Sequence, residues 1–255
     1  TDSMQQRQHR GPMPYIERDT SWMYFNKRIL LEAMRPDLPL LERFNYLGIY
    51  SNNLDEFFRV RVASLRRLID SAEELPSAER KKAKETLRTI LRLNREYSQL
   101  FDETFAQLVR ELKDAHIHII NEHELTSSQE EEVLSFFMDK INGFTNPIFI
   151  NSPTFNPEQH LKESLYLAVV LWHDQEEPET GHEVALLEVP VRELGRFFRL
   201  HDEGGESYLM FLDDVIRYCL PYIFIGREYV QYEAYTFKFT KDAEFEIEQD
   251  LRSSV

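Results

Sequence analysis

The chain has 255 residues, 42% hydrophobic and 29% charged, which excludes a disordered segment and leaves room for one large domain or two ordinary ones. The formal net charge of −15 argues against nucleic acid as the main partner, and against a long polyanion bound across the whole surface, because phosphate binding needs a basic face. No apolar run reaches the roughly 18 residues of a transmembrane segment, and the single cysteine, Cys219, excludes an internal disulfide and favours a reducing cytoplasm.

The first part of the chain is predicted to be a helical bundle behind a loose lead-in over residues 1–14. From Thr20 onward, apolar side chains recur at steps of three and four, the pattern of a helix that buries one face. Pro39 suits the first turn of a second helix, and a long charged helix is expected over residues 77–114. The expected buried stripes are Trp22, Phe25, Ile29, Leu30 and Ala33, then Leu40, Leu41, Phe44 and Leu47, and in the long helix Leu87, Ile90, Leu91, Leu100, Leu108 and Leu112.

Another helix is predicted to begin at the two asparagines of "YSNNLDEFFRVRVASL", residues 50–65. Asparagine is a poor residue inside a helix and a good one at its start. Asn53 with Glu56, or Asn52 with Asp55, fits a capping box, and only one of the two asparagines can be the cap residue. The helix that follows is expected to bury Leu54, Phe57, Phe58, Val62, Leu65, Leu68 and Ile69.

From about residue 116 the pattern changes to short strands mixed with helices, which predicts an α+β domain of mostly antiparallel strands. Strands are expected at "HIHII", "PIFIN", "SLYLAVVLW", "EVALLEVP" and "YEAYTFKFT", with Leu165, Leu167, Val169 and Leu171 on one face. "RFFRL" and "YLMFL" flank "HDEGGES" as a hairpin. Helices are expected at "TSSQEEEVLSFF", which offers a cap and acids in the first turn, and through Val215, Ile216, Tyr218 and Cys219.

No catalytic constellation is visible in the sequence, because it contains neither a glycine-rich phosphate loop nor a serine or cysteine nucleophile motif. His116, His118 and His123 form the densest histidine group, and a metal site is conceivable there. Ordinary surface histidines on an edge strand are favoured, since no carboxylate stands at a helical ligand spacing beside them. The paired acids Asp213 and Asp214, and the acids at 130–132, are expected to cap and solvate helix starts.

The asparagine pair also offers a hypothesis about ligand binding. If Asn52 is the cap, the carboxamide of Asn53 lies in the first helical turn, and its two donors and one acceptor suit the base or sugar of a nucleotide. A phosphate at the same helix end would be repelled by Asp55 and Glu56. The residues alone favour plain capping over ligand binding and leave both open.

Several stretches resemble the amino-terminal part of the polyphosphate kinase family, the bacterial enzymes that phosphorylate their own histidine. They are "YIERDTSWMYFNKRILLEA", "PLLERFNYLGIYSNNLDEFFRVRVASLRR", "FLDDVIRYCL" and "YTFKFTKDAEFEI". The resemblance runs in order from about Tyr15 to Glu248. Its first block is specific, whereas residues 71–210 match mainly in pattern.

The resemblance implies reversible transfer of the terminal phosphate of ATP to inorganic polyphosphate through a phosphohistidine, with Mg²⁺ as cofactor. It implies a helical domain over residues 15–115, an α+β head domain over residues 116–255, and a contact between Asn53 and ATP with Asn52 or Ser51 as the cap. We expect homo-oligomers that pair through the head domain, and a cytoplasmic location with peripheral attachment to a membrane left open.

The resemblance also implies that the essential parts of the enzyme lie in carboxy-terminal domains absent from this chain. These parts are the phosphorylated histidine, the Mg²⁺ ligands, the other nucleotide contacts and most of the lysines and arginines that hold polyphosphate. This chain alone is therefore expected to be inactive. A rival hypothesis is a non-catalytic module that shares the architecture and binds another protein, and a weaker one is a histidine-bound metal protein.

Overall fold

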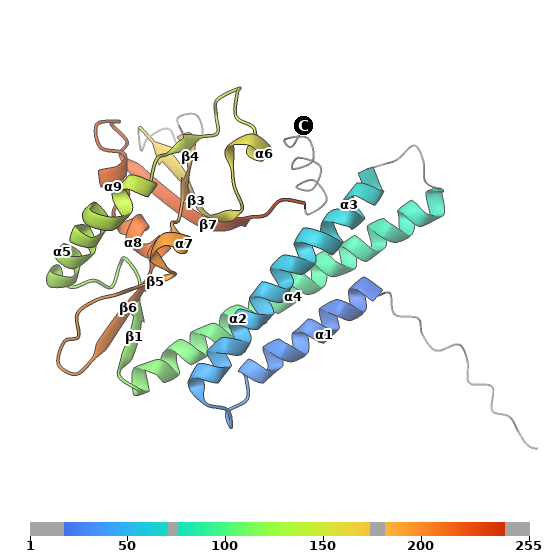
Figure 1. Ribbon diagram of the computed structural model, residues 1–255, viewed down its shortest axis with the longest axis horizontal. Helices are drawn as coiled ribbons and strands as arrows, with labels where there is room; N and C mark the ends of the chain where they lie inside the picture. Colours follow the sequence, from blue (N-terminus) through green and yellow to red (C-terminus); the bar gives the residue numbers. More distant parts are fainter. Residues whose placement is uncertain (1–17, 71–75, 174–181, 243–255) are drawn as a thin grey trace, which may run out of the picture. The chain divides into compact units, whose positions relative to one another are not determined.

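The computed structural model describes residues 18–70, 76–173 and 182–242, and the chain divides into two compact units, Thr1–Ala106 and Gln107–Val255. The first unit is helical (Figure 1). Its elements are α1 (Arg18–Ala33), α2 (Leu40–Phe57), the π-helical segment η1 (Phe58–Val62), α3 (Ala63–Asp70) and the first part of α4 (Ser77–Asp114). The long helix predicted over residues 77–114 has these bounds.

The asparagine pair does not start a helix, and both predicted capping boxes are wrong. Helix α2 begins at Leu40, behind Pro39, and runs through Asn52 and Asn53 to Phe57. It continues without a break through η1 into α3, so residues 40–70 form one helical run where two helices were expected. Asn52 with Asp55 and Asn53 with Glu56 match the capping pattern in sequence. The helix nevertheless starts more than three turns before them, at Leu40.

The buried face of α1 also differs from the prediction. Its buried residues are Asp19, Met23, Asn26, Leu30 and Ala33, which follow one another at steps of four and three. Phe25, expected in the core, is 59% exposed. Two of the five buried residues are polar, so a stripe drawn through apolar residues alone falls on a neighbouring face of the helix.

Helix α4 packs along α1 and α2 through aromatic side chains. The ring of Phe105 meets Phe44 edge-on, with 6.1 Å between ring centroids, and Phe101 lies 5.9 Å from the ring of Tyr50. The ammonium of Lys27, on α1, lies 5.1 Å above the ring of Tyr97. The buried residues of α4 include Ala83, Thr86, Ile90, Leu93, Tyr97, Thr104, Leu108 and Leu112, whereas Leu91, predicted inside, is 40% exposed.

The second unit is α+β, as predicted. A three-stranded sheet has the order β1 (Ile117–Ile120), β6 (Ser207–Phe211), β5 (Phe197–Arg199), with β1 parallel to β6. An antiparallel sheet has the order β2 (Ile148–Phe149), β4 (His182–Glu188), β3 (Ser164–Trp172), β7 (Gln231–Phe239). The remaining helical elements are α5 (Ser127–Phe136), η2 (Phe137–Ile141), η3 (Asn142–Phe144), α6 (Pro157–His160), α7 (Val191–Leu194), α8 (Leu212–Tyr218) and α9 (Leu220–Ile223).

Several local predictions for this unit are confirmed. Thr126 and Gln129 form a complete capping box at the start of α5. Strands β5 and β6 form the expected antiparallel hairpin, and Gly204 and Gly205 in its turn have φ values of +61° and +83°, which favour glycine.

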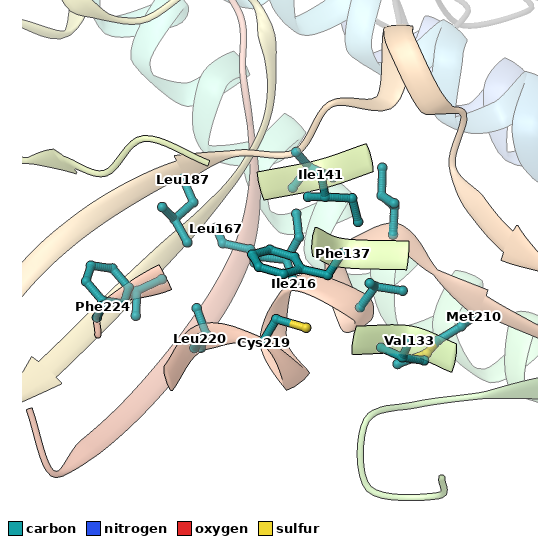
Figure 2. Close-up of a cluster of buried hydrophobic side chains, with 14 of the residues drawn as sticks. Val133, Phe137, Ile141, Leu167, Leu187, Met210, Ile216, Cys219, Leu220 and Phe224 are labelled. Atoms are coloured by element: carbon teal, nitrogen blue, oxygen red, sulfur yellow. The ribbon is translucent and has the colours of Figure 1, made fainter. Parts of the chain in front are cut away.

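The core of the second unit joins the two sheets to the helices. Leu167, Val169 and Leu171 point from β3 into it and are fully buried, as the alternation predicted. Figure 2 shows the ring of Phe137, from η2, beside Leu167 and beside Ile216 of α8. Cys219 is buried in the same cluster, and burial raises the pKa of its thiol to about 12, so the thiol stays protonated.

Candidate functional site

Asn53 lies within a row of hydrogen bonds between α1 and α2. Its Nδ2 donates to Oδ1 of Asn26 at 3.3 Å, and Nδ2 of Asn26 donates to the backbone carbonyl of Tyr50 at 3.2 Å. Asn26 is 1% exposed, whereas Asn53 is half-buried at the edge of the interface. The two side chains thus hold each other in place, with Asn26 anchored to the backbone of α2.

Two charged contacts extend this row toward both ends of α1. Asp19, buried near the start of α1, accepts hydrogen bonds from Nε of Arg61 at 2.9 Å and pairs with the same guanidinium at 2.8 Å. Near the other end, Nε of Arg43 donates to the carbonyl of Ala33 at 2.9 Å. We call the row formed by Asp19, Arg61, Asn26, Asn53 and Arg43 the polar seam. Its buried groups have partners, as groups removed from water require.

The π-helical segment η1 lies directly after the asparagine pair. One wide turn shifts the residues that follow around the helix axis, and such turns occur frequently at functional sites. Here the segment carries Arg61, which meets Asp19 across the interface. Before it, the ring of Phe57 stacks on Trp22 with 4.1 Å between centroids and 2° between planes. The stack fixes the spacing of α1 and α2 beside the seam.

The position of Asn53 inside α2 changes what it can offer to a ligand. The helix begins at Leu40, so the positive end of the helix dipole and its unpaired N–H groups are distant from Asn53. Only the side chain is available. One N–H is directed to Asn26, and the carboxamide of Asn53 makes no other hydrogen bond within the described residues, so its carbonyl oxygen and second N–H remain for a partner.

Comparison with known proteins identifies the family. A family model described as the polyphosphate kinase N-terminal domain matches residues 15–120, and one described as the polyphosphate kinase middle domain matches residues 128–255. The chain belongs to the polyphosphate kinase family. The first matched segment covers most of the helical unit and the start of the α+β unit. The second covers the α+β unit from residue 128 onward.

Relatives in the polyphosphate kinase family are much longer than this chain. The polyphosphate kinase of Vibrio parahaemolyticus is 34% identical over 254 residues, and that of Escherichia coli is 36% identical over 245 residues. Each match covers 94% of this chain and 34% of the relative. The crystal structure of polyphosphate kinase from Porphyromonas gingivalis matches with a TM-score of 0.77 at 27% identity, over 92% of this chain and 34% of that one.

The histidines meet a carboxylate that sequence spacing did not reveal. Nδ1 of His116 and Nε2 of His118 lie 2.8 and 2.7 Å from the two oxygens of Glu206. These hydrogen bonds hold the pKa of Glu206 below its usual value. The parallel pairing of β1 with β6 brings these residues together although they are far apart in the chain. Within residues 18–70, 76–173 and 182–242, no group of three metal-ligating side chains is placed to hold an ion.

The acids expected to solvate a helix start are instead part of a buried network. Asp213 and Asp214 lie in the first turn of α8, as predicted, but Asp213 is 5% exposed. Arg217 donates to both carboxylates, at 3.4 and 2.6 Å. Burial, and next the charge of Glu122, raises the pKa of Asp214 to about 6.

An open pocket lies beside this network in the α+β unit. It measures about 460 Å³ and is bordered by Glu122, Arg217, Tyr218 and Tyr235 among others. Its lining mixes both signs of charge with phenol rings. No sequence pattern predicted it, because its walls come from three separate segments of the chain.

Proposed function

We propose that this chain forms the first two domains of a longer polyphosphate kinase, which transfers the terminal phosphate of ATP reversibly to polyphosphate through a phosphohistidine. The family match over both units supports this assignment, and the chain spans about a third of the length of the curated relatives it matches. The phosphorylated histidine and the Mg²⁺ ligands belong to the remaining domains. In this proposal the chain supplies one wall of the nucleotide site.

The contact that we assign to the nucleotide is the carboxamide of Asn53. The observation that carries this assignment is the hydrogen bond from Asn53 to the buried Asn26, which holds a neutral polar group at the edge of the polar seam. A side chain held before the ligand arrives loses less freedom on binding. A carboxamide matches the hydrogen-bonding edges of a base, a ribose hydroxyl or a single phosphate oxygen.

The test replaces Asn53 by alanine in the full-length enzyme that carries this segment. Loss of one hydrogen bond contributes about 1 kcal/mol, so we expect the KM for ATP to rise about five- to tenfold. Asn52→Ala is the matched control, because Asn52 is the neighbouring residue on the same helix and is exposed. An unchanged KM in Asn53→Ala, or an equal rise in both variants, removes Asn53 from the nucleotide site.

We also propose that subunits pair through the α+β unit. Among the described strands, β7 is an edge of its sheet. Near its start Ile225 and Val230 are 77% and 50% exposed, and Tyr235 on the strand itself is 58% exposed. Exposed apolar residues at an unpaired edge are typical of contact surfaces. Light scattering of the enzyme with Ile225→Lys and Val230→Lys should show a smaller particle, and an unchanged mass would contradict pairing at this edge.

A further inference from the structure

Charge is distributed unevenly along α4. Between residues 77 and 95 this helix has seven basic and two acidic side chains, whereas between residues 96 and 114 it has two basic and five acidic ones. The protein as a whole carries a formal charge of −15. The first half of α4, which lies beside α3 in Figure 1, is therefore a local positive region on an acidic protein.

Five of these basic residues form a continuous line. Lys81, Lys84, Arg88, Arg92 and Arg95 follow one another at steps of three, four, four and three residues, which places them on one face of the helix. All five are exposed. We call this line the basic stripe. Its two ends are 14 residues apart in the sequence, which is about 21 Å at the helical rise of 1.5 Å per residue.

The basic stripe lies opposite the buried face of α4. At about 100° per residue, the buried residues Ala83, Ile90, Leu93 and Tyr97 lie on the far side of the helix from the stripe. Packing of α4 against α1 and α2 therefore leaves the stripe directed to solvent within the helical unit. The arrangement is a straight row of cations on a rigid support.

Most of the stripe is not engaged with acidic side chains. Arg92 pairs with Glu96 at 2.8 Å, with exposed fractions of 60% and 55%, and an exposed pair of this kind is weak. Lys81, Lys84, Arg88 and Arg95 make no ion pair with the part of the chain that the structure describes. Four cations that have no acidic partner among the described residues form a surface that attracts phosphate.

We infer that the basic stripe of α4 binds a segment of the polyphosphate chain. This inference rests on the proposed function, which supplies a linear polymer with a negative charge on every phosphate. A row of guanidinium and ammonium groups neutralises successive phosphates of such a chain and releases their counterions. The sequence-based expectation is that most cations for polyphosphate lie outside this region, and the stripe accounts for only five basic residues.

The composition of the stripe distinguishes polyphosphate from single-stranded nucleic acid. Proteins that hold single strands combine basic residues with aromatic rings on which the bases stack. Residues 77–95 include no phenylalanine, tyrosine or tryptophan. A partner that consists only of phosphate groups fits the surface better than one that carries bases.

The test measures binding of end-labelled polyphosphate, longer than the stripe, to the 255-residue chain by fluorescence anisotropy. The stripe variant combines Lys84→Glu, Arg88→Glu and Arg95→Glu. The matched control combines Arg28→Glu, Lys113→Glu and Lys140→Glu. The three control residues are exposed and lie off the stripe, and their replacement changes the net charge by the same amount. We expect at least about a tenfold loss of affinity in the stripe variant and no more than about a twofold loss in the control.

Two further measurements sharpen the test. The slope of log affinity against log salt should be about −0.7 for each phosphate contact and should become shallower by about 2 in the stripe variant. If the glutamate variant does not fold, the corresponding glutamine variant replaces it. Equal losses in the stripe variant and the control, or stronger competition by polyuridylate than by polyphosphate at equal phosphate concentration, would overturn the inference.

The outcome is independent of the nucleotide proposal. Asn53→Ala should bind polyphosphate as the unchanged chain does, because Asn53 is not part of the stripe. If the stripe variant binds normally while Asn53→Ala raises the KM for ATP, only the inference about the stripe fails. If the stripe binds polyphosphate while Asn53→Ala leaves the KM unchanged, only the nucleotide contact fails.

Discussion

The buried side-chain amide of Asn26 should stabilise the helical unit, although asparagine is an unfavourable residue inside a helix. Replacing Asn26 by alanine removes the hydrogen bonds to Tyr50 and Asn53, at 3.2 and 3.3 Å, and leaves a small cavity between α1 and α2. A neutral hydrogen bond contributes about 0.5–1.5 kcal/mol to stability. Because these two bonds are long, each is expected to contribute near the lower end of that range. With the cavity, the expected loss in the free energy of unfolding is about 2 kcal/mol.

A matched control separates this loss from the helix propensity of alanine. Asn45 is an exposed asparagine on α2, and Asn45→Ala should stabilise the unit by about 0.5 kcal/mol or leave it unchanged. The same gain applies to Asn26→Ala, so the difference between the two variants isolates the buried contacts.

Urea denaturation followed by tryptophan fluorescence measures both values. The chain has two tryptophans, one in each unit, and Trp172→Phe leaves Trp22, which stacks on Phe57 and reports on the helical unit. Unfolding free energies and m-values then come from one signal. Equal stabilities for Asn26→Ala and Asn45→Ala would refute the reasoning that the polar seam holds α1 against α2.

The other predictions concern helix faces, capping and pH. Met23→Ala should cost about 2–5 kcal/mol and Phe25→Ala less than about 1 kcal/mol, measured in the same assay, because Met23 is buried and Phe25 is exposed. Thr126→Ala should lower the stability of the α+β unit by about 1 kcal/mol while Thr126→Ser keeps it, since a hydroxyl preserves the capping box. The pKa of Asp214 is raised by burial to about 6, so the folded protein retains a proton that the unfolded chain loses near its ordinary value. The contribution of Asp214 to stability should therefore fall by about 2–3 kcal/mol as pH rises from about 4 to 6. Denaturation at several pH values should show this fall in the difference in unfolding free energy between the unchanged protein and Asp214→Asn.

Elements with strong local signals could be predicted from the sequence. The alternation in β3 identified its buried face, the glycine pair identified the hairpin turn, and the spacing around Thr126 identified a cap. These features depend on neighbouring residues only, so local rules describe them. The α+β class followed from the same local patterns.

The polar seam could not be predicted, because it requires polar residues where the rules place apolar ones. Asp19 and Asn26 are buried since each meets a partner on the helical run of α2 and η1, at a separation of 24 to 42 residues. Asparagine favours helix starts over helix interiors. Asn53 nevertheless lies inside α2, where its side chain donates a hydrogen bond to Asn26 on α1. The contact between His118 and Glu206 depends on strand pairing in the same way.

The most direct measurement of the central claim is the position of Asn53 relative to bound nucleotide. A structure of the full-length enzyme with a non-hydrolysable ATP analogue should place the carboxamide of Asn53 about 3 Å from a nucleotide atom, with its hydrogen bond to Asn26 intact. A nucleotide bound with Asn53 facing only Asn26 would contradict the account.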